Sequence, residues 1–231
     1  MKVGSVDIWT ARLDLSDVEL PVCLSLLSSE EKQRTNRYRS FTDARRFAIS
    51  RAFLRSVLAG YVEQSPGALR FEYSEYGKPL LHERAGFEFN LSHAGELAVL
   101  AVTTVAPIGV DVELVRTIPD LLPIANSLFS SIEYDEIESK CANCRLRAFL
   151  NCWTRKEAIV KALGEGLSIP LNLFSVSVEC ERPRVLSAVA PIGMNWTLWN
   201  LNCPDSHVGA IAIAGPPCPL TQHSWQGPSH E

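Results

Sequence analysis

The chain has 231 residues, of which 46% are hydrophobic and 21% are charged. Such a composition is typical of a folded globular protein, and the length fits one large domain or two small ones. A formal net charge of −4 excludes a globally basic nucleic-acid coat. The apolar run 97–102 is far shorter than the roughly 18–20 residues of a membrane-spanning helix, and Asp7 and Arg12 interrupt any signal-peptide core. We therefore expect no nucleic-acid partner and no membrane partner.

Apolar periodicity predicts two long helices, at 43–61 and 148–167, with Gly60 and Gly164 near their ends. After each helix come polar, strand-like segments and then a short, almost purely apolar strand. This order suggests two similar halves of about a hundred residues each. Because strands and single helices occur without regular alternation, the pattern indicates an α+β fold. The predicted strands are 70–73, 88–91, 97–102, 108–114, 176–178, 196–201 and 208–213.

The last seventeen residues, 215–231, hold four of the fourteen prolines and show no periodic pattern, which predicts a flexible tail. Seven cysteines, an odd number in a chain of this size, are typical of reduced thiols and a cytoplasmic location. Cys141 and Cys144 are the one closely spaced pair. Since no second such pair and no nearby histidine accompany them, we interpret them as ordinary thiols rather than a zinc or redox site.

Carboxylates stand out in two of the predicted elements. Asp111 and Glu113 are two residues apart in an apolar strand, so both project from one face. Glu157 and Lys161 are four residues apart and share one face of the second long helix. If Glu157 met the strand carboxylates, the three would form an oxygen-ligand site of the kind that Mg²⁺ takes. Sequence spacing leaves open the alternatives of a solvated strand face and a surface helix pair.

A basic segment precedes and enters the first long helix. It contains eight Lys or Arg residues and a single acid, Asp43, and it suits a compact polyanion better than a nucleic acid because no aromatic platform is interleaved. The chain has no glycine-rich phosphate loop of either common type, so a phosphate would be held by side chains, a metal or isolated amides. The eight residues are Lys32, Arg34, Arg37, Arg39, Arg45, Arg46, Arg51 and Arg55.

Five segments, in this order, resemble the 4′-phosphopantetheinyl transferases of the monomeric, surfactin-synthetase-activating type. They are GKPLL (77–81), FNLSHAGELAVLAV (89–102), IGVDVE (108–113), FSSIEYDEI (129–137) and WTRKEAIVK (153–161). The resemblance implies a pseudo-dimer of two similar α+β subdomains, 1–105 and 106–214, with the active site in the cleft between them and 215–231 as a tail. It also implies a monomeric enzyme.

The same resemblance implies a reaction and its partners. In this family a serine hydroxyl of an apo acyl or peptidyl carrier protein attacks coenzyme A, the phosphopantetheine arm is transferred, and adenosine 3′,5′-bisphosphate leaves. Mg²⁺ is implied as cofactor, with Asp111, Glu113 and Glu157 as its ligands, and Lys161 would contact the phosphates. The general base would be Glu157, directly or through a metal-bound water, or Glu133.

For coenzyme A, the resemblance places Lys78 and Pro79 near the adenine and Ser92 and His93 at the phosphates. Arg46 and the Arg34 region are expected at the 3′-phosphate. One position that is often basic in the family is Glu31 here, and the neighbouring Lys32 or Arg37 is a possible substitute.

Two other functions share some of these residues. A different Mg²⁺-dependent enzyme, such as a phosphohydrolase, would use the same carboxylates but would have no use for the GKP and Ser-His segments. A non-catalytic module that binds coenzyme A or a carrier is expected to lack one of the three acids, and all three are present.

Overall fold

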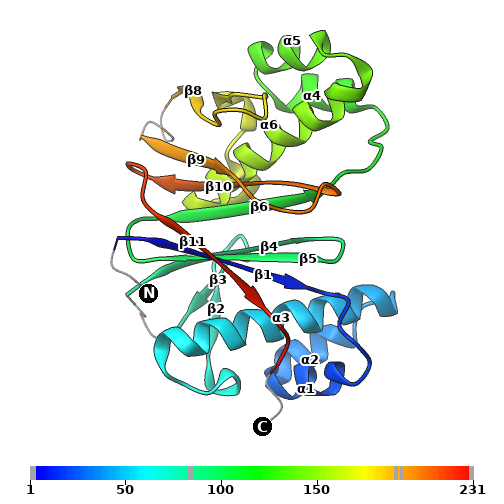
Figure 1. Cartoon of the computed structure of the whole chain (residues 1–231), viewed down its shortest axis with the longest axis vertical. Helices are drawn as coiled ribbons and strands as arrows, with labels where there is room; N and C mark the ends of the chain where they lie inside the picture. Colours follow the sequence, from blue (N-terminus) through cyan, green and yellow to red (C-terminus); the bar gives the residue numbers. More distant parts are fainter. Residues whose placement is uncertain (1–3, 83–85, 190–191, 193–194, 229–231) are drawn as a thin grey trace.

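A computed structural model of the chain describes residues 4–82, 86–189, 192 and 195–228. Two halves lie one above the other along the long axis (Figure 1). In each half a small sheet faces the other half, and a long helix covers the outer face of that sheet. Among the described residues, no helix is both long and apolar enough to cross a bilayer.

The first half begins with a strand and two short helices, continues with a 22-residue helix and ends in two β-hairpins. In its sheet, β1 and β4 both pair antiparallel with β5, which lies between them. Its elements are β1 (Val6–Arg12), α1 (Glu19–Leu26), α2 (Ser29–Thr35), α3 (Phe41–Val62), β2 (Phe71–Tyr73), β3 (Pro79–Leu81), β4 (Glu88–Ala94) and β5 (Leu97–Thr103).

The second half repeats this order of elements, and its strands β6 and β9 both pair antiparallel with a central β10. This arrangement confirms the predicted α+β pseudo-dimer and the internal repeat. The elements are β6 (Ile108–Leu114), α4 (Leu121–Leu128), α5 (Ser131–Ser139), α6 (Ala142–Leu163), β7 (Phe174–Val176), β8 (Val185–Ala188), β9 (Trp196–Asn200) and β10 (His207–Ala214).

The core consists of three layers of apolar side chains, of which one joins the two halves. One layer lies between α3 and the first sheet, one between α6 and the second sheet, and a third between the two sheets. β5 is buried on both faces, with Leu100 in the first layer and Val99 in the third. Burial on both faces explains why its sequence is a continuous apolar run rather than an alternating one.

The prediction of a flexible tail over 215–231 is wrong for residues 220–225. Leu220–Trp225 forms β11, which pairs parallel with β1 and extends the first sheet. Trp225 packs 5.5 Å from Phe53, and His223 stacks on Trp9 at 4.4 Å. The prolines misled the prediction because Pro216, Pro217 and Pro219 lie before the strand and Pro228 lies after it, where Pro does not interrupt a sheet.

Candidate functional site

The predicted acids lie where the two halves meet. β6 runs beside β4 of the first half, and the β4 side chains Asn90 and Ser92 reach across to it. Asn90 accepts a hydrogen bond from the backbone N–H of Val110 at 2.9 Å, and Ser92 Oγ donates to Asp111 Oδ1 at 3.1 Å. Lys161, from α6, places Nζ 2.5 Å from Asp111 Oδ1 and 3.1 Å from Ser92 Oγ. Three elements from both halves therefore converge on Asp111.

A glycine brings α6 close enough for this contact. A Cβ atom at Gly109 would lie 1.9 Å from the carbonyl oxygen of Ala158 and 2.6 Å from the backbone nitrogen of Ala162. Only hydrogen fits there, so the helix rests directly on β6. Glu157 and Lys161 occupy the same turns of α6, and Asp111 follows Gly109 on the same face of the strand.

The three carboxylates lie in each other's electrostatic field. Burial raises the pKa of Asp111, against the opposing charge of Lys161. The pKa of Glu113 and that of Glu157 are also raised, by burial first and by the negative charge of Asp111 second. Asp111 Oδ2 and Glu157 Oε1 are buried without a hydrogen-bond partner. Unpaired oxygens and raised pKa values both indicate that the cluster lacks positive charge, which a divalent cation would supply.

In the described part of the chain, no three His, Cys, Asp or Glu side chains are gathered as a ready-made metal site. Asp111 contacts Lys161, and Glu113 accepts a hydrogen bond from the Trp153 side chain. The assignment of Asp111, Glu113 and Glu157 as the ligands of Mg²⁺ stays a prediction. The donor set nevertheless fits Mg²⁺, because this ion is usually held by only one or two carboxylates, with waters and substrate phosphates completing the octahedron.

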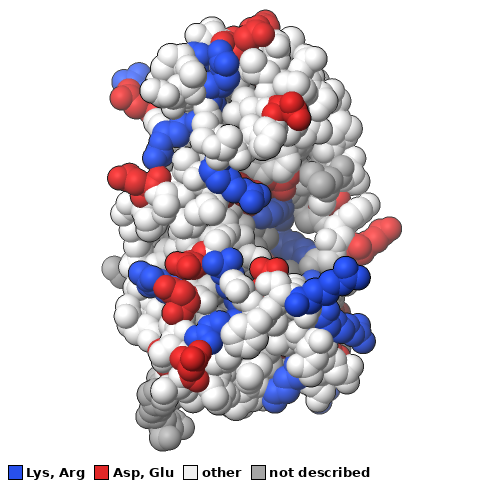
Figure 2. All heavy atoms as spheres, turned by 90° about the vertical axis from the view of Figure 1, so that its right-hand side faces the viewer, with Lys and Arg blue, Asp and Glu red and all other residues white. Residues whose placement is uncertain are grey.

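A small pocket of about 190 Å³ lies beside Lys161. Lys78 and Pro79 line it from the first half and Gly164 and Gly166 from the end of α6, so it spans the junction. Burial lowers the pKa of Lys78. Figure 2 shows a hollow between the two halves, with both basic and acidic side chains around it. Lys78 and Pro79, the two residues predicted to contact adenine, thus line the same pocket as Lys161, which is predicted to contact the phosphates.

His93 ends the predicted Ser-His pair, with its ring surface open to solvent. Desolvation by neighbouring groups, followed by the positive charges of Lys161 and Arg46, lowers its pKa. Arg46 is partly buried and lies 3.6 Å from Glu96. Lys32 and Arg34 are exposed on α2, and the Arg34 guanidinium lies over the Phe47 ring at 5.0 Å. These basic groups of the first half are available to contact an anionic ligand.

The family models match both halves of the chain. Residues 107–212 match the 4′-phosphopantetheinyl transferase superfamily, and residues 14–105 match the N-terminal region of 4′-phosphopantetheinyl transferases. The chain is 36% identical to the 4′-phosphopantetheinyl transferase HetI of Nostoc sp., over 91% of this chain and 88% of the relative. The chain belongs to the 4′-phosphopantetheinyl transferase superfamily. It is accordingly a transferase.

Two further relatives of this 4′-phosphopantetheinyl transferase family have similar identities. The transferase Sfp of Bacillus subtilis is 34% identical over 71% of this chain and 72% of its own length. The transferase AcpT of Salmonella typhimurium is 40% identical over 50% of this chain and 57% of its own. The solved holo-[acyl-carrier-protein] synthase of Thermotoga maritima covers 47% of this chain and 62% of its own at 19% identity, with a TM-score of 0.38 that is too low to add to the fold description.

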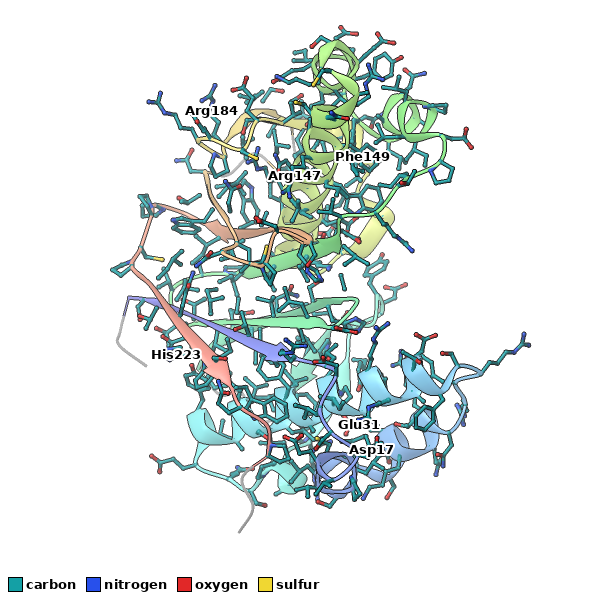
Figure 3. The ribbon with its side chains drawn as sticks, turned by 45° about the vertical axis from the view of Figure 1, so that its right-hand side comes forward. Asp17, Glu31, Arg147, Phe149, Arg184 and His223 are labelled. Atoms are coloured by element: carbon teal, nitrogen blue, oxygen red, sulfur yellow. The ribbon has the colours of Figure 1, made fainter. Side chains whose placement is uncertain are left out.

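Within this transferase the predicted basic cluster divides into two sets. Arg51 and Arg55 are buried and face Glu31, with ion-pair distances of 2.6 Å each (Figure 3 labels Glu31). Arg45 pairs with Asp17 at 2.5 Å. Arg51 and Arg55 support the first half from inside, so the prediction that the whole cluster suits a phosphate is wrong for these two, whereas Arg45 is held in a surface ion pair. The acid Glu31 is the partner of the two buried arginines.

Glu133 is buried in the core of the second half and holds structural elements together. Its side chain is fully buried and completes a capping box with Ser130 at the start of α5. Oε2 lies 2.8 Å from Lys156 Nζ, and Oε1 accepts from the Val176 backbone N–H at 2.7 Å. Because both oxygens are occupied, the geometry argues against Glu133 as the general base.

Several site residues of the transferase were not predicted. Asn90 lies two residues before Ser92 on the same strand face, a spacing that could have identified it. Trp153, which stacks on Phe149, also donates to Glu113. Tyr76 packs closely on Gly166: a Cβ atom at Gly166 would lie 3.0 Å from the Cβ atom of Tyr76. This contact depends on tertiary folding and has no signal in the sequence.

Proposed function

We propose that this chain transfers the 4′-phosphopantetheine arm of coenzyme A to a serine hydroxyl of an apo acyl or peptidyl carrier protein, with release of adenosine 3′,5′-bisphosphate. The observation that carries the proposal is the convergence of Asp111, Ser92 and Lys161 at the junction of the two halves. Family membership supplies the reaction class, and the assignment of individual residues is ours.

Magnesium would be held by Asp111 and Glu157, whose buried oxygens lack partners, with Glu113 completing the acidic group. When bound, the ion would neutralise charge that develops on the diphosphate. Trp153 would orient Glu113 through its hydrogen bond. Because phosphoryl transfer depends mainly on positioning and charge stabilisation, this arrangement needs no covalent intermediate on the protein.

The remaining polar groups would bind and orient coenzyme A. Lys161 carries a point charge one helical turn beyond Glu157 and would contact the diphosphate. Ser92 and His93 would donate to phosphate oxygens from β4. Lys78 and Pro79, which line the pocket beside Lys161, would contact the adenine. The basic residues Lys32, Arg34 and Arg46 would contact the 3′-phosphate.

Glu157 is the residue we propose as general base. Burial raises its pKa, which makes the carboxylate a better proton acceptor than an exposed glutamate. With Oε1 assigned to the metal ion, the other carboxylate oxygen of Glu157, Oε2, would accept the proton of the carrier serine, directly or through one water.

Intact-mass analysis of an apo carrier protein, incubated with the enzyme, coenzyme A and Mg²⁺, tests the proposal. We expect the carrier to gain the mass of one phosphopantetheine, and a chelator to abolish the gain. Free phosphate release without a labelled carrier would instead indicate a phosphohydrolase. Binding of coenzyme A with neither product would indicate a non-catalytic module.

A further inference from the structure

Two cysteines lie side by side at the start of α6. Cys141 is the N-cap residue of this 22-residue helix and Cys144 is in its first turn. Their sulfur atoms are 2.9 Å apart and share a hydrogen bond, and both residues are exposed. The sequence favoured ordinary thiols because no other metal ligand is nearby. The geometry shows instead a preformed, accessible dithiol.

The surroundings of this dithiol distinguish its two sulfurs. The contact with the Cys144 side chain, and then the nearby backbone N–H of Cys144 at the start of the helix, lowers the pKa of Cys141. The pKa of Cys144 is raised, first by its hydrogen bond to Cys141 and then by the charge of that group. A thiolate at a helix N-terminus with a second thiol in reach is the arrangement of a nucleophilic and a resolving cysteine. Cys141 is the nucleophile in this arrangement.

We propose that Cys141 and Cys144 form a redox-active dithiol that exchanges with small-molecule disulfides. The Cys141 thiolate attacks one sulfur of the oxidant RSSR, the S–S bond breaks, and RS⁻ leaves and takes up a proton. Cys144 then loses its proton and attacks Cys141 Sγ, which expels the second RS⁻. The two cysteines are oxidised by two electrons to a disulfide, and RSSR is reduced to two RSH.

This dithiol is separate from the transfer chemistry. Glu157 lies sixteen positions after Cys141, which corresponds to about 24 Å along α6. Disulfide formation and phosphopantetheine transfer can therefore be measured independently, and failure of one leaves the other untouched.

Oxidised glutathione and the full-length protein test the proposal. Lys140 and Arg145 flank the pair, so trypsin releases the five-residue peptide 141–145. After oxidation and quenching with an alkylating agent, we expect this peptide about 2 Da lighter than the dithiol form and without alkyl groups. In Cys144→Ser we expect glutathione to stay attached at Cys141, because the resolving thiol is missing.

Cys141→Ser should react about tenfold more slowly, since the nucleophile with the lowered pKa is removed. Cys180→Ser, which changes another exposed thiol, is the matched control and should leave the formation of the disulfide unchanged. Full alkylation of peptide 141–145 after oxidation, equal reactivity of the two single variants, or the same oxidation rate in urea-unfolded protein would each overturn the proposal.

Discussion

The two halves of the molecule share one architecture but differ at the positions that matter for chemistry. β1 and β6 each have seven residues, and α3 and α6 each have twenty-two, so equivalent positions can be counted from the first residue of each element. The acids of the second half have no acidic counterparts in the first. Trp9 corresponds to Asp111, Ala11 to Glu113 and Ser56 to Glu157.

The same comparison explains a difference in packing. Gly109 lets α6 rest on β6, whereas its counterpart in β1 is Asp7, whose carboxylate accepts a hydrogen bond from Tyr61 at 2.7 Å. α3 therefore lies away from β1, and a cavity of about 710 Å³ remains there, lined by Trp9 and Ser56 and by Trp225 of β11. The second half has a charged, closely packed site, whereas the first has an aromatic cavity lined in part by β11, a strand without a counterpart among the described residues of the second half.

The buried ion pairs are the feature that the two halves retain. In each, a capping-box glutamate faces the long helix: Glu31 pairs with Arg51 and Arg55, and Glu133 with Lys156. Arg55 and Lys156 are equivalent positions, and both also donate to backbone carbonyls of the loop after the helix. The first half therefore has two cations for its glutamate, and the second half has one.

Removing the single cation of the second half is expected to give the largest effect. Lys156→Met leaves Glu133 buried without a counter-charge, which should lower the free energy of unfolding by about 3–5 kcal/mol. Arg51→Met leaves Arg55 on Glu31, so the loss should be about 2 kcal/mol. Urea unfolding of both variants measures the difference. Equal losses would show that Arg55 does not compensate for the missing charge of Arg51.

The acids can be tested against their counterparts in the same assay. Asp111→Asn and Glu157→Gln should each reduce kcat/KM for carrier labelling by about 10²–10³-fold, because each removes a charge on which the site depends. Ser56→Ala, at the α3 position equivalent to Glu157, is the control and should leave the rate unchanged. Thermal melting checks that the variants are folded. Full activity of Asp111→Asn in Mg²⁺ contradicts the assignment.

Glycine substitutions test the difference in helix packing. Gly109→Ala forces α6 away from β6 and should cost about 3 kcal/mol of unfolding free energy, with a loss of transfer activity since Lys161 moves with the helix. Gly60→Ala on α3 meets open space and should instead stabilise the protein by about 0.5–1 kcal/mol. A neutral Gly109→Ala would mean that the close helix contact is unimportant.

These differences mark how far the sequence could predict the molecule. The strand 108–114 was predicted with its observed bounds, since an apolar run containing Asp111 and Glu113 has a local signal. The repeat and the two long helices were also predicted. The burial of Arg51 and Arg55 was not, because a basic side chain looks the same in sequence whether it faces solvent or Glu31.

The added strand β11 offers a smaller test. Trp225→Ala removes a partly buried ring from the layer that also contains Phe53, and we expect a loss of about 2 kcal/mol in unfolding free energy. Transfer activity at saturating substrate should be retained, because β11 contacts the first half. His223→Ala, which removes only the ring stacked on Trp9, should cost less. If the Trp225→Ala protein had unchanged stability, β11 would contribute nothing to the folded state, as expected for a flexible tail.

The acid dependence of stability gives the smallest and most specific effect. Burial alone would raise the pKa of Glu31, but the charges of Arg51 and Arg55 and its hydrogen bonds outweigh burial and lower it. At pH values between the lowered pKa of native Glu31 and the ordinary glutamate pKa, the unfolded state then binds more protons than the native state. The stabilisation is therefore present above that range and is lost as pH falls through the lowered value. Glu31→Gln should reduce the slope of unfolding free energy against pH between about pH 5 and pH 2, measured in urea. An unchanged slope would show that Glu31 does not couple folding to protons.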